Sequence, residues 1–245
     1  LKAASFVAPE MAQVHAIQSR TPEECWPLFF NTFAVMNYDL QSAFTEFGDW
    51  LLQQDMIGPY REYRRQLQIL TNPEQPTQLV LKCPEHLWFL DSLLEVFPDA
   101  CVVWTHRDPV ASIASYSSLI SLGWRMLYGR IDAPLIGAHI AERFLTGVTR
   151  GMEARQNARP GQIFDVDFQE LVADPVAMVR RIHDHFQLEH SPEMDGSVEA
   201  WLANERADAR GQHRYSASVY GLDVAEIHRQ YSAYIDRFNI PVQGT

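Results

Sequence analysis

Residues 100–122 have the sequence ACVVWTHRDPVASIASYSSLISL and contain the strongest structural signal in the chain. The run from Ala100 to Trp104 is short, apolar and rich in β-branched residues, which predicts a buried parallel strand. Asp108 and Pro109 then predict the start of a helix, because Asp caps free backbone amides and Pro suits the first helical turn. The segment therefore predicts a strand that leads directly into a helix.

Arg107 lies at this predicted junction, beside the positive end of the helix dipole. Ser112 and Ser115 are three residues apart, so both hydroxyl groups can face the same side of the helix. An arginine, serine hydroxyl groups and a helix N-terminus are together typical of a phosphate-binding site. The alternative is an arginine that caps the strand and serines that the helix merely tolerates.

Strand and helix signals alternate on both sides of this segment. Residues 78–82 (QLVLK) and 162–168 (QIFDVDF) predict two more strands, and Pro84 and Pro175 mark helix starts. This order predicts an α/β fold with a parallel sheet flanked by helices. Ligands of open parallel sheets bind at the carboxyl ends of the strands. The residues expected at these three ends are Lys82, Arg107 and Asp167.

The chain length of 245 residues suits one α/β domain, and we expect residues 1–245 to form it. Residues 1–77 should be mainly helical, with helices from Thr21 to about Phe33 and from Tyr60 to Leu70. Residues 78–190 should form the strand and helix core, interrupted by an irregular segment at 123–139. Residues 191–245 should supply a basic loop at 206–215 and a C-terminal helix at 220–238.

Composition excludes several classes of function. The formal net charge of −11 argues against nucleic acid as a partner, because binding of the phosphate backbone needs a basic face. The sequence has no signal peptide and no apolar run of about 18 residues, so we expect no membrane span. Cys25, Cys83 and Cys101 have no paired spacing, which predicts reduced thiols and a cytoplasmic protein.

Several chemical motifs are missing or incomplete. No GxxxxGK[ST] motif occurs, which excludes a nucleoside triphosphatase with a standard phosphate loop. The HRD triplet at 106–108 is not that of a protein kinase, because Ile113 stands where that loop needs Asn. Metal binding is not expected, since the histidines closest in sequence lack suitably spaced partners. These histidines are His183, His185 and His190.

Two further sites remain open from residue chemistry alone. His86 lies one turn into the helix expected after Lys82, and it could act as a general base because imidazole titrates near neutral pH. The alternative is a capping or core histidine. The basic loop at 206–215 either folds over an anionic ligand or is simply a solvated loop.

Four segments resemble, in the same order, those of sulfotransferases that use 3′-phosphoadenosine 5′-phosphosulfate (PAPS). HRDPVASIAS is similar to the family's 3′-phosphate-binding motif, in which a serine follows the arginine by eight residues. LVLKCPEHL resembles the LKSPxHL segment of a bacterial branch of the family. FQELVADP resembles YEDLxxDP, and GQHRYS near the C-terminus resembles a late HxY segment.

The resemblance implies a P-loop-kinase-like sulfotransferase fold and assigns roles to individual residues. Arg107 and Ser115 would hold the 3′-phosphate, and Phe168 stands where the family has a tyrosine. Lys82 would lie near the sulfuryl group, and His86 near the acceptor hydroxyl. Many cytosolic members instead have their catalytic histidine two residues after the lysine, where this chain has Pro84. The covering loop would contribute His213, Arg214 and Tyr215.

The implied reaction moves a sulfuryl group from PAPS to a hydroxyl of a small-molecule or lipid acceptor, leaving adenosine 3′,5′-bisphosphate (PAP) and needing no metal. The family's first strand and PxSGTT-like phosphosulfate loop have no counterpart before Lys82. Because the chain begins at Leu1 rather than Met, we expect a fragment of a longer enzyme. The alternative is a non-catalytic nucleotide- or partner-binding protein that has lost this loop.

Overall fold

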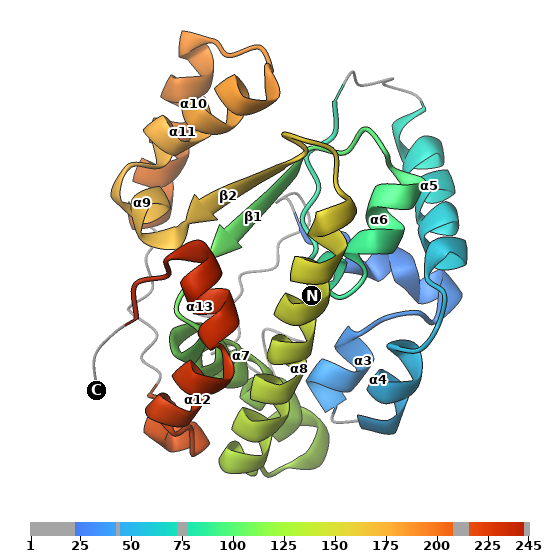
Figure 1. The fold of residues 1–245 in the computed structure, drawn as a ribbon, viewed down its shortest axis with the longest axis vertical. Helices are drawn as coiled ribbons and strands as arrows, with labels where there is room; N and C mark the ends of the chain where they lie inside the picture. Colours follow the sequence, from blue (N-terminus) through green and yellow to red (C-terminus); the bar gives the residue numbers. More distant parts are fainter. Residues whose placement is uncertain (1–22, 43–44, 73–77, 208–215, 243–245) are drawn as a thin grey trace.

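The computed structural model describes residues 23–42, 45–72, 78–207 and 216–242. Within them a two-stranded sheet lies among many helices (Figure 1). Strands β1 (Val102–His106) and β2 (Ile163–Asp167) pair in parallel, with Val102 opposite Ile163 and His106 opposite Asp167. The carboxyl ends of the two strands therefore lie at the same edge, which confirms the predicted parallel arrangement.

The other described elements are helices. The α-helices are α3 (Asn37–Ser42), α4 (Thr45–Leu51), α5 (Ile57–Thr71), α6 (Leu90–Val96), α7 (Pro109–Tyr128), α8 (Ala133–Ala154), α9 (Phe168–Ala173), α10 (Pro175–Phe186), α11 (Pro192–Ala207), α12 (Val224–Gln230) and α13 (Ser232–Phe238). The short 3₁₀ helices are η1 (Trp26–Thr32), η2 (Pro84–Leu87), η3 (Arg155–Asn157) and η4 (Ala217–Tyr220).

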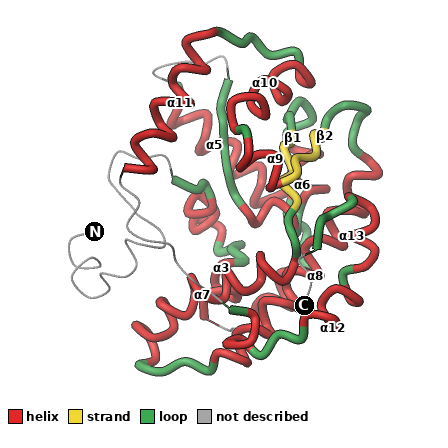
Figure 2. The backbone as a smooth tube through the Cα atoms, turned by 90° about the vertical axis from the view of Figure 1, so that its left-hand side faces the viewer, coloured by secondary structure: helices red, strands yellow, loops and turns green. Residues whose placement is uncertain are grey.

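The helices form two groups around the sheet. Figure 1 shows α9, α10 and α11 beyond β2, with α5 and α6 on the opposite side of the strands. Figure 2, turned by 90°, shows α12 and α13 close to α8. Most of the largest fully buried side chains lie on α5, α7 and α8 or on the residues beside α6 and α13, which locates the core among these helices. Examples are Tyr60, Tyr63, Phe89, Ile113, Ile136, Ile140 and Tyr231.

Helix α7 begins as its sequence predicts. The Asp108 carboxylate accepts a hydrogen bond from the backbone N–H of Val110 at 2.9 Å, and Pro109 is the first helical residue. The helix ends at Gly129, whose φ of 72° lies in the left-handed region that favours glycine.

The predicted irregular segment at 123–139 is wrong. Helix α7 continues to Tyr128, and α8 begins at Ala133. The sequence contains the reason, because Asp132 caps α8 by accepting from the backbone N–H of Leu135 at 3.1 Å. Gly123 lies inside α7, where its cost to the helix is small compared with the packing of its neighbours.

The predicted strand at 78–82 is also wrong, since these residues have no regular secondary structure. Val80 is 92% exposed, and the segment's backbone contact is a hydrogen bond from Cys25 N–H to the Lys82 carbonyl at 2.9 Å. A strand needs a neighbouring backbone to pair with, and an apolar run alone cannot supply one.

Smaller differences occur at both ends. The first described helix is the 3₁₀ helix η1 rather than an α-helix from Thr21, which lies outside the described residues. The predicted C-terminal helix is two helices, α12 and α13, which meet at Tyr231. In the predicted amphipathic helix Tyr60 and Tyr63 are buried as expected, but Leu70 is exposed.

No helix among the described residues combines the length and the apolar character needed to cross a membrane.

Candidate functional site

Arg107 and Phe168 meet at the carboxyl edge of the sheet. Arg107 follows β1 directly, and Phe168 follows β2 as the first residue of α9. The Arg107 guanidinium lies over the Phe168 ring, 4.6 Å from its centroid. This cation–π contact orients the guanidinium plane at the sheet edge where an anion was predicted to bind. The structure thus brings together two residues that lie far apart in the sequence.

The two serines of α7 are in different situations. The Ser112 hydroxyl donates to the Asp108 carbonyl at 3.1 Å, so it is committed to the helix backbone. Ser115 is partly exposed, and its hydroxyl makes no hydrogen bond to the part of the chain that the structure describes. Ser115 is therefore the better of the two to bind a ligand. Asp108 is buried and also contacts His228 Nε2 at 3.1 Å.

His106 fastens the end of β1 beside Arg107. Its Nε2 lies 2.9 Å from Asp165 on β2, and its Nδ1 lies 3.1 Å from the Tyr234 hydroxyl on α13. Its ring stacks on Phe238 with 3.9 Å between centroids. Burial lowers the pKa of His106, although the Asp165 carboxylate opposes this shift. The residue before Arg107 is therefore held from two sides.

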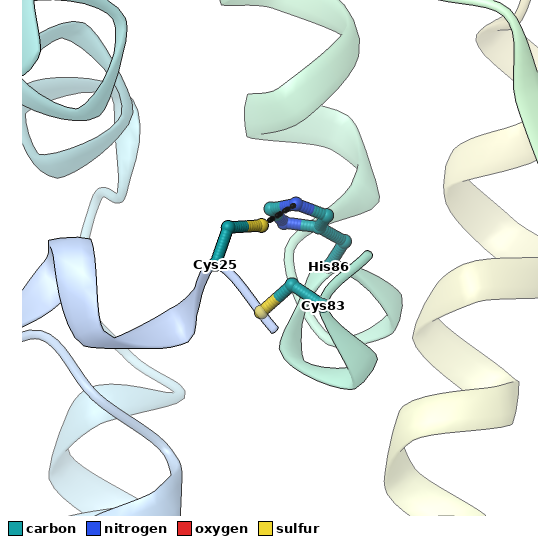
Figure 3. A group of neighbouring side chains, drawn as sticks. All are labelled: Cys25, Cys83 and His86. Atoms are coloured by element: carbon teal, nitrogen blue, oxygen red, sulfur yellow. Dashed lines mark hydrogen bonds between the residues drawn. The ribbon is translucent and has the colours of Figure 1, made fainter. Parts of the chain in front are cut away.

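His86 lies in η2 and is contacted at both ring nitrogens. Its Nδ1 is 2.8 Å from the Tyr60 hydroxyl, and its Nε2 is 3.8 Å from Cys25 Sγ. Figure 3 shows the Cys25 sulfur pointing to the His86 ring, with the Cys83 side chain next to both. The hydrogen bond with Cys83, together with His86, lowers the pKa of the Cys25 thiol. The same hydrogen bond, together with burial, raises the pKa of the Cys83 thiol.

Sequence reasoning missed this cluster of Cys25, Cys83 and His86. Cys25 is far from the other two residues in sequence, so no spacing pattern includes all three. The available signal was Cys83-x-x-His86, which places both side chains at the same end of a short helix.

Lys82 lies at the surface, where its ammonium group forms an ion pair with the Glu24 carboxylate. Its side chain is 68% exposed. Because the segment 78–82 is not a strand, Lys82 does not end one as predicted. It remains tied to Cys25 through the backbone and through the hydrogen bond from the Cys25 thiol to its carbonyl at 3.3 Å.

Glu85 connects η2 with α7. Its two carboxylate oxygens accept from the backbone N–H groups of Met36 at 2.9 Å and Asn37 at 3.0 Å. The Asn37 side-chain oxygen in turn accepts from the Tyr116 hydroxyl at 3.1 Å, and Tyr116 follows Ser115 on α7. Burial raises the pKa of Glu85 to about 7, against the effect of the two backbone donors. These hydrogen bonds join Glu85 and Tyr116, the sequence neighbours of His86 and Ser115.

Of the three histidines considered for metal binding, His183 and His190 pack edge to face with 5.2 Å between their ring centroids. His183 and His185 each contact a separate backbone carbonyl, whereas His190 contacts the Asp195 carboxylate. His213, Arg214 and Tyr215 of the predicted covering loop lie outside the described residues. A cavity lined by residues of α8, η3 and α13 contains none of the predicted site residues in its lining.

Comparison with known proteins identifies the family. The model of the sulfotransferase family matches residues 1–192, which is most of the chain. The chain belongs to the sulfotransferase family. This confirms the family resemblance carried by the four motifs.

Two curated relatives and two solved structures are similar to the chain. The omega-hydroxy-beta-dihydromenaquinone-9 sulfotransferases Stf3 of Mycobacterium bovis and Mycobacterium tuberculosis are each 24% identical over 165 residues. This match includes 65% of this chain and 40% of each relative, so the chain spans less than half of their length.

The solved structures agree on the fold. Sulfotransferase STF1 of Mycobacterium tuberculosis superposes with a TM-score of 0.75 and 31% identity, covering 89% of this chain and 57% of that one. Sulfotransferase STF9 of Mycobacterium avium gives a TM-score of 0.81 and 25% identity, covering 98% of this chain and 65% of that one. The helix-rich chain with its small parallel sheet therefore has the sulfotransferase fold.

Proposed function

We propose that this protein transfers a sulfuryl group from PAPS to a hydroxyl group of a small-molecule or lipid acceptor. The observation that carries the proposal is the Arg107–Phe168 pair at the carboxyl edge of the parallel sheet, directly before α7. Membership of the sulfotransferase family supports the transfer reaction. PAPS as the donor and a hydroxyl as the acceptor are the finer parts of the proposal.

The 3′-phosphate of the nucleotide is proposed to bind between Arg107 and Ser115. The planar guanidinium offers two parallel N–H donors to phosphate oxygens, and the Phe168 ring restrains its orientation. The Ser115 hydroxyl would add a third donor. The loop containing His213, Arg214 and Tyr215 is proposed to cover the nucleotide.

His86 is proposed to take the proton of the acceptor hydroxyl on Nε2. The hydrogen bond between Tyr60 and Nδ1 orients the ring for this task. The acceptor oxygen then bonds to sulfur while the bond from sulfur to the phosphate oxygen breaks, and PAP leaves. Lys82 would exchange its ion pair with Glu24 for the sulfuryl oxygens, where a positioned cation stabilises the spread negative charge.

A lipid alcohol is one acceptor class that the relatives support. Stf3 is named for a hydroxylated menaquinone, which is a long apolar molecule with a terminal hydroxyl group. We propose that the reaction occurs in the cytoplasm, a location that the three free cysteines support.

Binding of PAP tests the nucleotide site. Isothermal titration of PAP into the full-length protein should give an affinity that Arg107→Ala weakens by about 1.5–3 kcal/mol, because a charged hydrogen-bond pair is lost. Arg65→Ala is the matched control, since Arg65 is exposed on α5 and pairs with Glu62. Equal affinities of Arg107→Ala and Arg65→Ala would exclude the 3′-phosphate assignment.

Transfer from radiolabelled PAPS to phenols and long-chain alcohols tests the reaction itself. His86→Ala should lower turnover by roughly 10²–10⁴-fold, the usual contribution of general base catalysis, with little change in PAP affinity. PAP binding without transfer to any acceptor would instead support a non-catalytic nucleotide-binding protein.

A further inference from the structure

The geometry points to a binding site for a thiophilic divalent cation, Zn²⁺ by preference, formed by Cys25, Cys83 and His86. Their donor atoms all lie within 4.8 Å of one another. The Cys25 residue precedes η1, whereas Cys83 and His86 belong to the start of η2, so the site joins two separate segments (Figure 3).

The spacing of one pair of donor atoms, Cys25 Sγ and His86 Nε2, matches that of two ligands on a tetrahedral ion. With Zn–S bonds of about 2.3 Å and Zn–N bonds of about 2.0–2.1 Å, tetrahedral ligands lie roughly 3.5–3.8 Å apart. The Cys25 sulfur and His86 Nε2 are 3.8 Å apart in the structure. Only a small adjustment is needed to place both atoms on one ion.

The surroundings orient the ligands. Tyr60 holds His86 Nδ1 at 2.8 Å, which leaves Nε2 directed at Cys25, as outer hydrogen bonds do for metal-bound histidines. Phe29 and Tyr63 pack their rings against the imidazole. Both thiols are buried, each with 8% of its residue surface exposed.

The Tyr63 hydroxyl also adjoins the site. It is buried and lies against the Cys25 thiol. A buried hydroxyl donor beside this sulfur favours the thiolate, which is the form of cysteine that binds a metal.

The donor set selects the type of metal. Two thiolates and one imidazole favour Zn²⁺ and similar soft ions, whereas Mg²⁺ and Ca²⁺ prefer oxygen ligands. Cys83 is also the point at which this chain differs from the family segment LKSPxHL, because the cysteine replaces a serine. A serine hydroxyl is a poor zinc ligand, so the site belongs to this chain and not to relatives with serine.

Metal binding and proton transfer would compete for His86. Both use the lone pair of Nε2, so a loaded ion and the proposed general base exclude each other. This relation rests on the proposed function, but the metal site does not. Full transfer activity of the zinc-loaded protein would remove His86 as the base and leave the metal site intact.

Direct binding tests the proposal. The full-length protein is treated with a chelator, kept reduced with a phosphine reductant, and titrated with Co²⁺ and Zn²⁺. We expect one ion per chain and, for Co²⁺, the sulfur-to-metal charge-transfer band and visible bands of a tetrahedral thiolate complex. Reduced protein that binds neither ion, or that shows no charge-transfer band, would overturn the proposal.

Variants identify the ligands. Cys25→Ser and Cys83→Ser should each weaken Zn²⁺ binding by more than roughly 100-fold, because loss of a ligand costs more than loss of an outer hydrogen bond. Cys101→Ser is the matched control, since Cys101 is an exposed free cysteine, and it should bind normally. Unchanged binding by both Cys25→Ser and Cys83→Ser would contradict the site.

Two further variants distinguish the loss of a metal ligand from misfolding of the protein. His86→Gln keeps both thiols, so Co²⁺ should retain its charge-transfer band while its visible bands change. Tyr60→Phe keeps every ligand and should weaken binding by roughly 10–100-fold through loss of the outer hydrogen bond. A visible spectrum that is identical in wild type and His86→Gln would exclude His86 as a ligand.

Discussion

At the scale of single residues, Phe168 is the clearest test of how the anion site is built. Its ring lies under the Arg107 guanidinium, and it stands where related sequences have a tyrosine. The aromatic ring alone is enough to orient the Arg107 guanidinium, and the hydroxyl group of a tyrosine at this position is not needed for that contact. We therefore propose that Phe168 would act on the nucleotide through Arg107.

Phe168→Ala should weaken PAP binding by roughly 2–30-fold, or about 0.5–2 kcal/mol, because Arg107 loses its cation–π partner. Phe164→Ala is the matched control, since Phe164 lies on β2 under a different arginine, Arg181. Isothermal titration of PAP measures both variants. The same loss of affinity in both would mean that Phe168 acts only through the stability of the sheet.

Residue-scale prediction from sequence succeeded where the signal was local. Arg107 follows a strand and precedes a capped helix, and each of these features depends on a few adjacent residues. The contact between Arg107 and Phe168 could be expected only from the parallel pairing of β1 and β2. The neighbours of His86 could not be predicted, because Cys25 and Tyr60 reach it only through tertiary packing.

At the scale of elements, α8 packs closely against η4 at Gly137. A Cβ atom on Gly137 would clash with the Tyr220 carbonyl oxygen, which is backbone and cannot rotate away. The absence of a side chain at this position allows the two elements to approach each other.

Gly137→Ala should destabilise the protein by about 1–3 kcal/mol, the usual cost of overpacking. Gly196→Ala is the control, because Gly196 lies in α11 with no atom within 4 Å of the added Cβ. That variant should be as stable as wild type or gain up to about 1 kcal/mol from helix propensity. Urea denaturation measures both, and equal midpoints would contradict the close packing of α8 and η4.

Element-scale prediction from sequence was correct for the starts of α7 and α10, missed the start of α8, and was weaker for strands. Asp108 and Asp174 cap α7 and α10 as predicted, because a cap depends on the next three residues. The apolar run at 78–82 has the composition of a strand, but no described segment pairs with it. Strand identity depends on a partner that local sequence does not specify.

At the scale of the whole molecule, His106 joins β1, β2 and α13. The ionisable groups around it include Asp165, Asp167, Arg155 and Tyr234. Burial lowers the pKa of His106 from its ordinary 6.5. Burial alone would raise the pKa of Asp165, but Arg155 and His106 hold it below 3.8. Asp165 therefore stays charged while His106 titrates.

The contribution of His106 to stability should fall as the pH decreases below about 6.5, whereas Glu85, whose pKa burial raises to about 7, contributes in the opposite direction. The unfolded chain protonates His106 near this pH, whereas the folded chain does so only at a lower pH, so unfolding takes up a proton in between. Above this window the contribution of His106 is fully present. Urea denaturation at a series of pH values measures the effect.

The difference in the free energy of unfolding between wild type and His106→Gln should shrink as the pH falls below about 6.5, because the variant lacks the His106 contribution. His185→Gln should keep the wild-type pH dependence, since His185 is an exposed histidine. A steep loss of stability that persists unchanged in His106→Gln would assign the effect to another group.

The hydrogen-bond chain from Glu85 through Asn37 to Tyr116 has a consequence for the order in which ligands bind. The nucleotide that we propose to bind at Arg107 and Ser115 would restrain α7 and, through this chain, η2. It would thereby reduce the entropy that the proposed acceptor beside His86 loses on binding. The two affinities should then rise by the same factor, since coupling between sites is reciprocal. Tyr116→Phe removes the hydroxyl that closes this chain, and it should make the two ligands bind independently of each other.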